Sequence, residues 1–112
     1  GLAGLETPPD VIIAANDDMA LGALQAVTDL GLAGEIDILG FDALPEAIGA
    51  VLSGDLAGTV EQFPGGQIRT AMRIAVMEAR GCAYEAEDAV FLTPIVISAD
   101  NVDAAERIGE VE

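Results

Sequence analysis

The chain has 112 residues, of which 52% are hydrophobic, 20 are acidic and 4 are basic, and its formal net charge is −16. This length suits one small domain or part of a larger one, and the apolar content supports a buried core. The negative charge repels phosphate groups, which disfavours nucleic acid and anionic membrane surfaces as partners. The absence of histidine excludes histidine-based triads and histidine-ligated metal sites.

Two features bear on where the protein works. Cys82 is the only cysteine, so no intrachain disulfide can form. Cysteine usage therefore does not indicate whether the protein works in an oxidising or a reducing compartment. Residues 1–7 lack the basic start and long apolar run of a signal peptide. We therefore expect either a cytoplasmic protein or a chain without its N-terminal part, and the motifs described below favour the second. The longest apolar run, residues 11–15, is far shorter than a membrane span of about 20 residues.

The first predicted unit is a strand followed by a helix. Residues 11–13 are β-branched and follow turn residues, which predicts a short strand buried on both faces. Asn16 or Asp17 is a good cap for a helix over about residues 19–30, because apolar side chains recur there at helical spacing. Gly31 is a natural end for this helix.

The second unit repeats the scheme. Residues 36–41 predict a buried strand that Asp42 closes. A proline suited to a first helical turn then opens a helix over about residues 45–52, which ends near Gly54. Residues 56–62 predict a third strand.

The third unit begins where a Phe-Pro-Gly-Gly sequence breaks the chain at residues 63–66. A long helix follows and ends at Gly81, and residues 82–88 form a polar connection. One helix face is apolar, and the other carries arginines that we interpret as a solvated face. The apolar positions are Ile68, Met72, Ala75, Val76 and Ala79, and the arginines are Arg69, Arg73 and Arg80.

The last predicted elements are a strand and a short helix. Residues 89–97 predict a fourth strand, which Pro94 interrupts. Proline removes a ladder donor, so this strand should lie at an edge or a crossover. Asn101 or Asp103 can cap a short final helix that reaches Ile108.

The alternation of strands and helices predicts an α/β fold with a parallel sheet flanked by helices. Ligands of such sheets bind beyond the carboxyl ends of the strands. Those ends carry Asn16-Asp17, Asp42 and Glu61-Gln62. Asparagine and glutamine both donate and accept, and an ionised aspartate accepts two or more strong hydrogen bonds. Asn16, Asp42 and Gln62 therefore match adjacent sugar hydroxyls, while taken singly each could be only a cap or turn residue.

The same strand ends could instead bind magnesium through Asp17, Asp18 and Asp42. The chain would then be a magnesium-dependent phosphoryl-transfer domain or a receiver-like domain. It is the weaker hypothesis, because all the basic residues lie on predicted helices. Residues 31–34 also lack the spacing and the lysine of a phosphate-binding loop.

Five strings resemble the ribose- and galactose-binding periplasmic proteins, which have the type I periplasmic binding protein fold. Residues 15–23 (ANDDMALGA) and 40–42 (GFD) are similar to family segments, and residues 42–47 resemble the galactose/glucose-binding branch. Residues 56–64 (LAGTVEQFP) look more like the ribose-binding branch, and residues 100–103 resemble a common C-terminal ending. The resemblance runs from about residue 9 to residue 103.

The resemblance implies roles for single residues. Asn16, Asp42 and Gln62 match sugar ligands of the C-terminal lobe, and Phe63, Pro64 and Pro94 match hinge positions. It implies that residues 1–62 are part of the C-terminal lobe. Residues 63–93 would form a helix and strand of the N-terminal lobe, and residues 94–112 would cross back to a C-terminal helix. The chain thus resembles the incomplete C-terminal part of a two-lobe receptor.

The function implied is that of the solute-binding component of an ABC-type sugar importer. Such a protein is not an enzyme, needs no cofactor or metal, works in the periplasm, and binds a monosaccharide and a transporter permease. An alternative is the effector domain of a lactose-repressor-type regulator, which shares the strings at residues 15–23 and 40–42. Missing lobe elements would leave apolar faces uncovered, so self-association of the chain is a further expectation.

Overall fold

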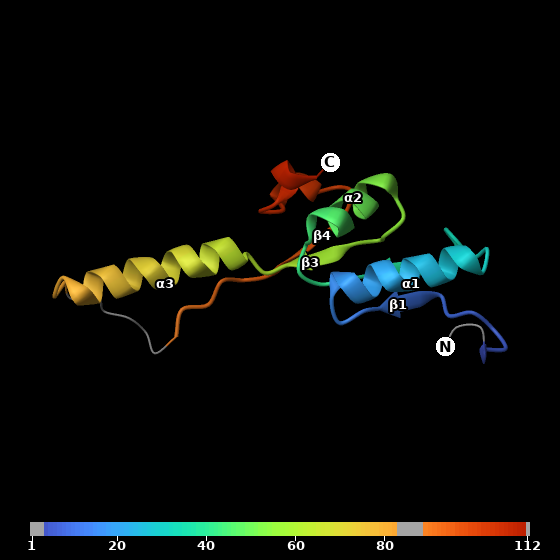
Figure 1. Cartoon of the computed structure of the whole chain (residues 1–112), viewed down its shortest axis with the longest axis horizontal. Helices are drawn as coiled ribbons and strands as arrows, with labels where there is room; N and C mark the ends of the chain where they lie inside the picture. Colours follow the sequence, from blue (N-terminus) through green and yellow to red (C-terminus); the bar gives the residue numbers. More distant parts are fainter. Residues whose placement is uncertain (1–3, 83–88, 112) are drawn as a thin grey trace.

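Strands and helices alternate along the chain, as the sequence predicts (Figure 1). The structure is a computed structural model that describes residues 4–82 and 89–111. Its strands are β1 (Val11–Ile13), β2 (Asp37–Leu39), β3 (Thr59–Glu61) and β4 (Ile95–Ile97). Its helices are α1 (Asp17–Asp29), α2 (Pro45–Ser53) and α3 (Pro64–Ala79), followed by the 3₁₀ turns η2 (Val102–Ala104) and η3 (Ile108–Glu110).

The strands form two two-stranded ladders, β1–β2 and β3–β4, and the first three strands run parallel. β1 pairs in parallel with β2, and a parallel bridge between Leu39 and Gly58 continues the order to the start of β3. β4 pairs antiparallel with β3, with Glu61 opposite Ile95. The predicted α/β class with a parallel sheet is therefore confirmed, and the fourth strand adds an antiparallel edge.

Local signals fix the ends of the first two helices. Met19 N–H donates to Asn16 Oδ1 at 2.9 Å, so Asn16 is the N-cap of α1. Pro45 occupies the first turn of α2, and Gly54 ends that helix with a left-handed φ of 84°. These caps confirm the predicted starts and ends to within about two residues.

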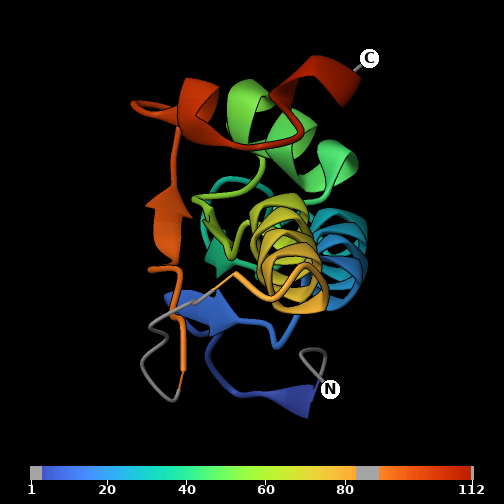
Figure 2. The ribbon, with the colours of Figure 1, turned by 90° about the vertical axis from the view of Figure 1, so that its left-hand side faces the viewer.

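Two apolar clusters hold the elements together. The first lies between α1, α2 and β2, and contains Ala20, Val27, Ile36, Ile38, Ala47, Val51 and Leu56. The second joins α2 to β4 and the C-terminal segment, and contains Ala43, Ile48, Ile97, Val102 and Ala105. Figure 2 shows the C-terminal turns lying beside α2. The C-terminal segment up to Val111 is therefore anchored to the same body as the first three strands.

Two predictions about the ends of the chain are wrong. The strand at residues 11–13 is not buried on both faces, since the Ile13 side chain is 81% exposed. In the described residues, helices cover only one side of this strand. The final helix to Ile108 is absent as well, because Ala105 is extended (ψ 131°) and separates two 3₁₀ turns. Glu106 N–H donates to the Glu61 carboxylate at 3.0 Å instead of continuing a helix.

The fourth strand is shorter than predicted. It begins at Ile95, directly after Pro94, and residues 89–93 form no strand. The position of β4 beside β3, at the end of the described strand order, agrees with the edge position that Pro94 predicts. Residues 83–88 of the predicted polar connection lie outside the described residues.

Helix α3 projects away from the sheet (Figure 1). The molecule measures 62 × 28 × 19 Å with a radius of gyration of 18.2 Å. A compact chain of this length has a radius of gyration of about 13 Å. None of the residues of α3 is buried, and Ile68, Met72 and Val76 of the predicted apolar face are exposed. No helix in the described part of the chain is long and apolar enough to span a membrane.

Candidate functional site

The carboxyl ends of the three parallel strands are tied side by side through their backbones. Asp17 N–H donates to Phe41 O at 2.8 Å, and Asp42 N–H donates to Val60 O at 2.9 Å. The first bond joins the end of the β1 unit to that of β2, and the second joins β2 to β3. The polar residues that follow each strand therefore share one edge of the sheet, where α/β proteins bind ligands.

Two of the three predicted sugar ligands are in direct contact. Gln62 Nε2 donates to Asp42 Oδ1 at 2.7 Å, and both residues are half-buried. Asn16 lies at the neighbouring strand end, next to the Asp17 amide that bonds to Phe41 after β2, and forms no hydrogen bond with the other two. Its Oδ1 is used as the helix cap, whereas its Nδ2 has no partner among the described residues. The site thus presents a paired carboxylate and amide beside a second amide donor.

Asp17 has a role that the sequence did not reveal. Its side chain is 0% exposed, and it accepts from the Thr59 hydroxyl at 2.7 Å and from Leu44 N–H at 2.8 Å. Burial raises the pKa of the Asp17 carboxyl, the bonds from Thr59 and Leu44 oppose this effect, and the charge of Asp42 adds to it. Because Asp17 is fully buried and both of its oxygens accept from protein donors, this carboxylate is not presented to a metal ion at the surface.

The turn that carries Asp42 has an unusual backbone. Asp42 and Ala43 have positive φ angles of 107° and 49°, a region that residues with a Cβ avoid at a cost of about 1–3 kcal/mol each. Ala43 N–H donates to the Thr59 hydroxyl at 3.2 Å, and Leu44 N–H to Asp17. Buried side chains therefore hold the turn in this conformation, which fixes the direction of the Asp42 side chain.

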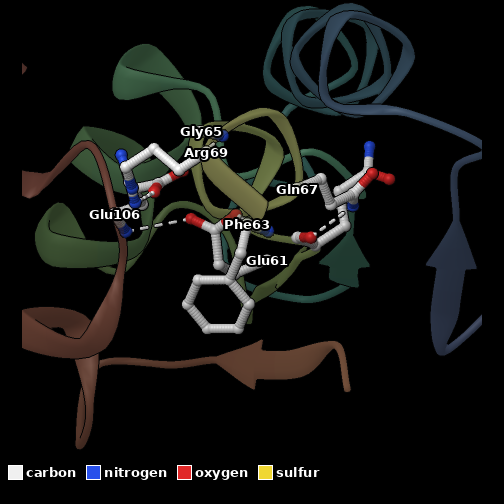
Figure 3. A network of polar contacts seen from close by, with 7 residues as sticks. Glu61, Phe63, Gly65, Gln67, Arg69 and Glu106 are labelled. Carbon is white, nitrogen blue, oxygen red and sulfur yellow. Dashed lines mark hydrogen bonds and ion pairs between the residues drawn. The ribbon is translucent and has the colours of Figure 1, made fainter. Parts of the chain in front are cut away.

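The predicted hinge at Phe63 and Pro64 is held by a buried glutamate (Figure 3). Glu61 is 0% exposed; its Oε1 accepts from Phe63 N–H at 2.6 Å, and its Oε2 accepts from Glu106 N–H at 3.0 Å. Phe63 has a left-handed φ of 55°, and Pro64 begins α3. Glu61 therefore joins the end of β3, the start of α3 and the C-terminal segment.

Glu106 completes this polar network. Its carboxylate accepts from Gly65 N–H at 2.8 Å and forms an ion pair with Arg69 (Figure 3). The hydrogen bond and charge of Arg69 lower the pKa of the Glu106 carboxyl. Arg69 was expected on a purely solvated face, and although its side chain is 73% exposed it binds the C-terminal segment. No sequence pattern signals these contacts, because Glu106 lies 37 residues from Arg69 and 45 from Glu61.

Comparisons with known proteins point to one family. The family described as "Periplasmic binding protein domain" matches residues 2–82. A xylitol-binding protein of Mycolicibacterium smegmatis is 39% identical over 97 residues, which is 86% of this chain and 27% of that protein. The D-galactose/methyl-galactoside binding periplasmic protein of Haemophilus influenzae is 37% identical over 100 residues, with 83% and 30% covered.

The chain is also similar to a solved structure of a binding protein. The crystal structure of the Caulobacter myo-inositol binding protein bound to myo-inositol has a TM-score of 0.85 and 48% identity, and the match covers 95% of this chain and 36% of that one. The chain thus spans about a third of the length of these relatives.

Proposed function

The chain belongs to the periplasmic binding protein domain family, and from this premise we propose that it is part of a receptor that delivers a monosaccharide or polyol to an ABC-type importer. The observation that carries the proposal is the contact between Gln62 and Asp42 at the carboxyl edge of the sheet, with the free amide nitrogen of Asn16 at the next strand end. The named relatives bind xylitol, galactosides and myo-inositol, all of which carry adjacent hydroxyl groups.

The chemistry of these groups suits hydroxyl recognition. Gln62 donates to one oxygen of Asp42, which leaves lone pairs on both Asp42 oxygens for ligand hydroxyls. A bond from a hydroxyl to a carboxylate is stronger than one between neutral groups, so Asp42 supplies the largest share. Asn16 Nδ2 and the Gln62 amide then donate to, or accept from, the neighbouring hydroxyls.

In this proposal the remaining contacts come from a second lobe. Residues 1–62 belong to the lobe with the site, residues 63–93 to the other lobe, and residues 94–112 return to the first. Three observations support this division: α3 projects without a buried residue, the junction at Phe63 and Pro64 lies beside the strand that follows Pro94, and the chain spans about a third of its relatives. A ligand that touches both lobes favours the closed arrangement.

The receptor proposal is favoured over the two alternatives. The relatives are named as binding proteins, which supports a non-catalytic receptor over the effector domain of a regulator. The full burial of Asp17, together with its hydrogen bonds from Thr59 and Leu44, disfavours the magnesium-dependent phosphoryl site. The relative from Haemophilus is named periplasmic, which supports a periplasmic location here. In this proposal the protein partner is the permease of the importer.

The proposal is tested by NMR titration of the chain with ribose, galactose, xylitol and myo-inositol. Weak binding is expected, because only one lobe contributes, and it should shift the signals of Asn16, Asp42 and Gln62. Asp42→Asn should weaken binding by about tenfold or more, since a charged acceptor is lost. The control Asp55→Asn changes an exposed aspartate that pairs with Ser53, and should bind as the parent does.

Two results would contradict the proposal. The first is the absence of any shift at these three residues up to the solubility limit of every ligand. The second is micromolar binding of the isolated chain by calorimetry, which would contradict the division of contacts between two lobes.

A further inference from the structure

Two fully buried polar side chains accept hydrogen bonds from the backbone of the turn that carries Asp42. We propose that Asp17 and Thr59 are a positioning pair, which holds this turn so that the Asp42 carboxylate faces Gln62 and a ligand. The proposal rests on the proposed function for its link to sugar, but the positioning itself is measurable without any ligand.

The hydrogen bonds of the pair connect β3, the start of α1 and the turn that carries Asp42. The Thr59 hydroxyl on β3 donates to Asp17 Oδ1 at 2.7 Å and accepts from Ala43 N–H at 3.2 Å. Asp17 Oδ2, at the start of α1, accepts from Leu44 N–H at 2.8 Å. The two backbone amides that directly follow Asp42 are therefore both held by this pair.

These two amides lie where the backbone needs support. Asp42 and Ala43 both adopt positive φ angles, which no glycine relieves at either position. A turn of this kind persists only where its surroundings determine it. The bonds to Asp17 and Thr59 fix the conformation on the C-terminal side of Asp42, and the bond from Asp42 N–H to Val60 O fixes it on the N-terminal side.

The neighbouring strand leaves room for the pair. A Cβ atom at Gly40 would lie 2.0 Å from Asp17 Oδ1, so the carboxylate occupies the space that a side chain directly after β2 would fill. Gly40 is buried and has no positive φ, so the need for glycine here is steric. This close approach commits the end of β2 to accepting the Asp17 carboxylate beneath the site.

Asp17 and Thr59 are 0% exposed, so no ligand at the surface can touch them. Their side-chain hydrogen bonds therefore act on a bound sugar through the turn and through Asp42. Their role therefore differs from that of Asn16, Asp42 and Gln62, which are half-buried at the edge itself. A positioning pair should affect the Asp42–Gln62 contact even when no sugar is present.

The test compares Thr59→Val, which removes the hydroxyl, with Thr59→Ser, which keeps it. The readout is the side-chain amide signal of Gln62 by NMR without ligand, because Gln62 Nε2 donates to Asp42 Oδ1. Thr59→Val should move this signal towards its position in unfolded peptides and speed hydrogen exchange at Ala43 and Leu44 about tenfold. Thr59→Ser should keep the parental Gln62 signal and the parental exchange rates at Ala43 and Leu44.

A stability control separates positioning from general loosening. Val27→Ala opens a cavity in the core formed by α1, α2 and β2, away from the turn, and should lower stability without moving the Gln62 signal. The proposal is overturned if Thr59→Val keeps the parental Gln62 signal, or if Val27→Ala moves it equally. Should Thr59→Val not fold, Asp17→Asn gives the same readout, because an amide can serve Leu44 but no longer accepts from Thr59 in the same geometry.

A sugar titration of the same variants distinguishes the two proposals. If the parent chain binds sugar, Thr59→Val should weaken binding about tenfold and Thr59→Ser should not. If the parent shows no binding, the proposed function fails, while the ligand-free Gln62 signal still decides whether Asp17 and Thr59 position the turn.

Discussion

Asn16 shows how one side chain can serve both the fold and the site. Its Oδ1 accepts from Met19 N–H and caps α1, whereas its Nδ2 has no partner among the described residues. A residue needed only as a cap could equally be serine or aspartate, because these cap helices about as well. The amide nitrogen is the part that the proposed ligand contact requires.

Substitution of Asn16 should separate these two roles. Asn16→Ser keeps a cap and should change the free energy of unfolding by less than about 0.5 kcal/mol, whereas Asn16→Ala should lower it by about 1 kcal/mol. Both variants lose the amide, so both should weaken the sugar-induced NMR shifts. Urea denaturation measures the first effect and titration the second. If Asn16→Ser binds sugar like the parent, Asn16 is a cap and nothing more.

The sequence made the cap of Asn16 predictable and left the role of Asp17 hidden. The Asn16 cap depends on a contact three residues away, which a local pattern reveals. The partners of Asp17 lie 27 and 42 residues away along the chain, at Leu44 and Thr59. Such contacts follow from the order of strands in the sheet, and one sequence carries no direct record of them.

Charged groups hold the junction between β3 and α3. Glu61 and Glu106 together bind the first turn of α3 and the C-terminal segment (Figure 3). A Cβ atom at Gly65 would lie 2.8 Å from Glu106 Oε1, so the close approach of the glutamate suits a glycine there. Arg69 then closes the network from the exposed side.

This network predicts a specific loss of stability in acid. The pKa of Glu106 is lowered in the folded chain, mainly by Arg69, so its ionised form binds the native state better. Its contribution is therefore present above the ordinary pKa of a glutamate and is lost as the pH falls through the lowered value. Glu106→Gln should flatten the fall in stability below about pH 5, as measured by urea denaturation across pH.

The matched control for this experiment is Glu78→Gln, which changes an exposed glutamate on α3, the helix that carries Arg69. This variant should keep the parental acid profile. Equal flattening in both variants would show that general charge repulsion, and not the bond to Arg69, sets the acid sensitivity.

At the scale of elements, local signals succeeded and long-range contacts caused the errors. Proline and glycine placed both ends of α2, because their backbone preferences act within one turn. The final helix was wrong because the amide of Glu106 bonds to the distant Glu61. The first strand was assigned two buried faces from its apolar residues alone, and such residues do not reveal which neighbours cover them.

The whole molecule combines a strong negative charge with a projecting helix, α3, that exposes apolar side chains. Ile68, Met72 and Val76 follow one face of α3, and none of them is buried. Single exposed apolar residues are common, but a continuous stripe on a projecting helix favours association. The charge of −16 opposes it at low salt through repulsion between copies.

We therefore expect the isolated chain to associate, and to do so more strongly as salt screens its charge. Met72→Glu places a charge in the stripe and should shift the chain to monomer in analytical ultracentrifugation over a dilution series. Arg73→Glu adds negative charge on the arginine face of the same helix and serves as the control, which should still associate. A parent chain that stays monomeric at every concentration and salt level would contradict this expectation.

The proposed site requires Asn16, Asp42 and Gln62 to face one ligand from the ends of three adjacent strands. The most direct measurement is the set of nuclear Overhauser contacts between ring protons of myo-inositol and the protein in the titrated chain. We predict contacts from the ligand to the side-chain amides of both Asn16 and Gln62, and none to Gln25, an exposed amide on α1 that pairs with Asp29. Contacts confined to other residues, or to only one of the two predicted amides, would contradict the account.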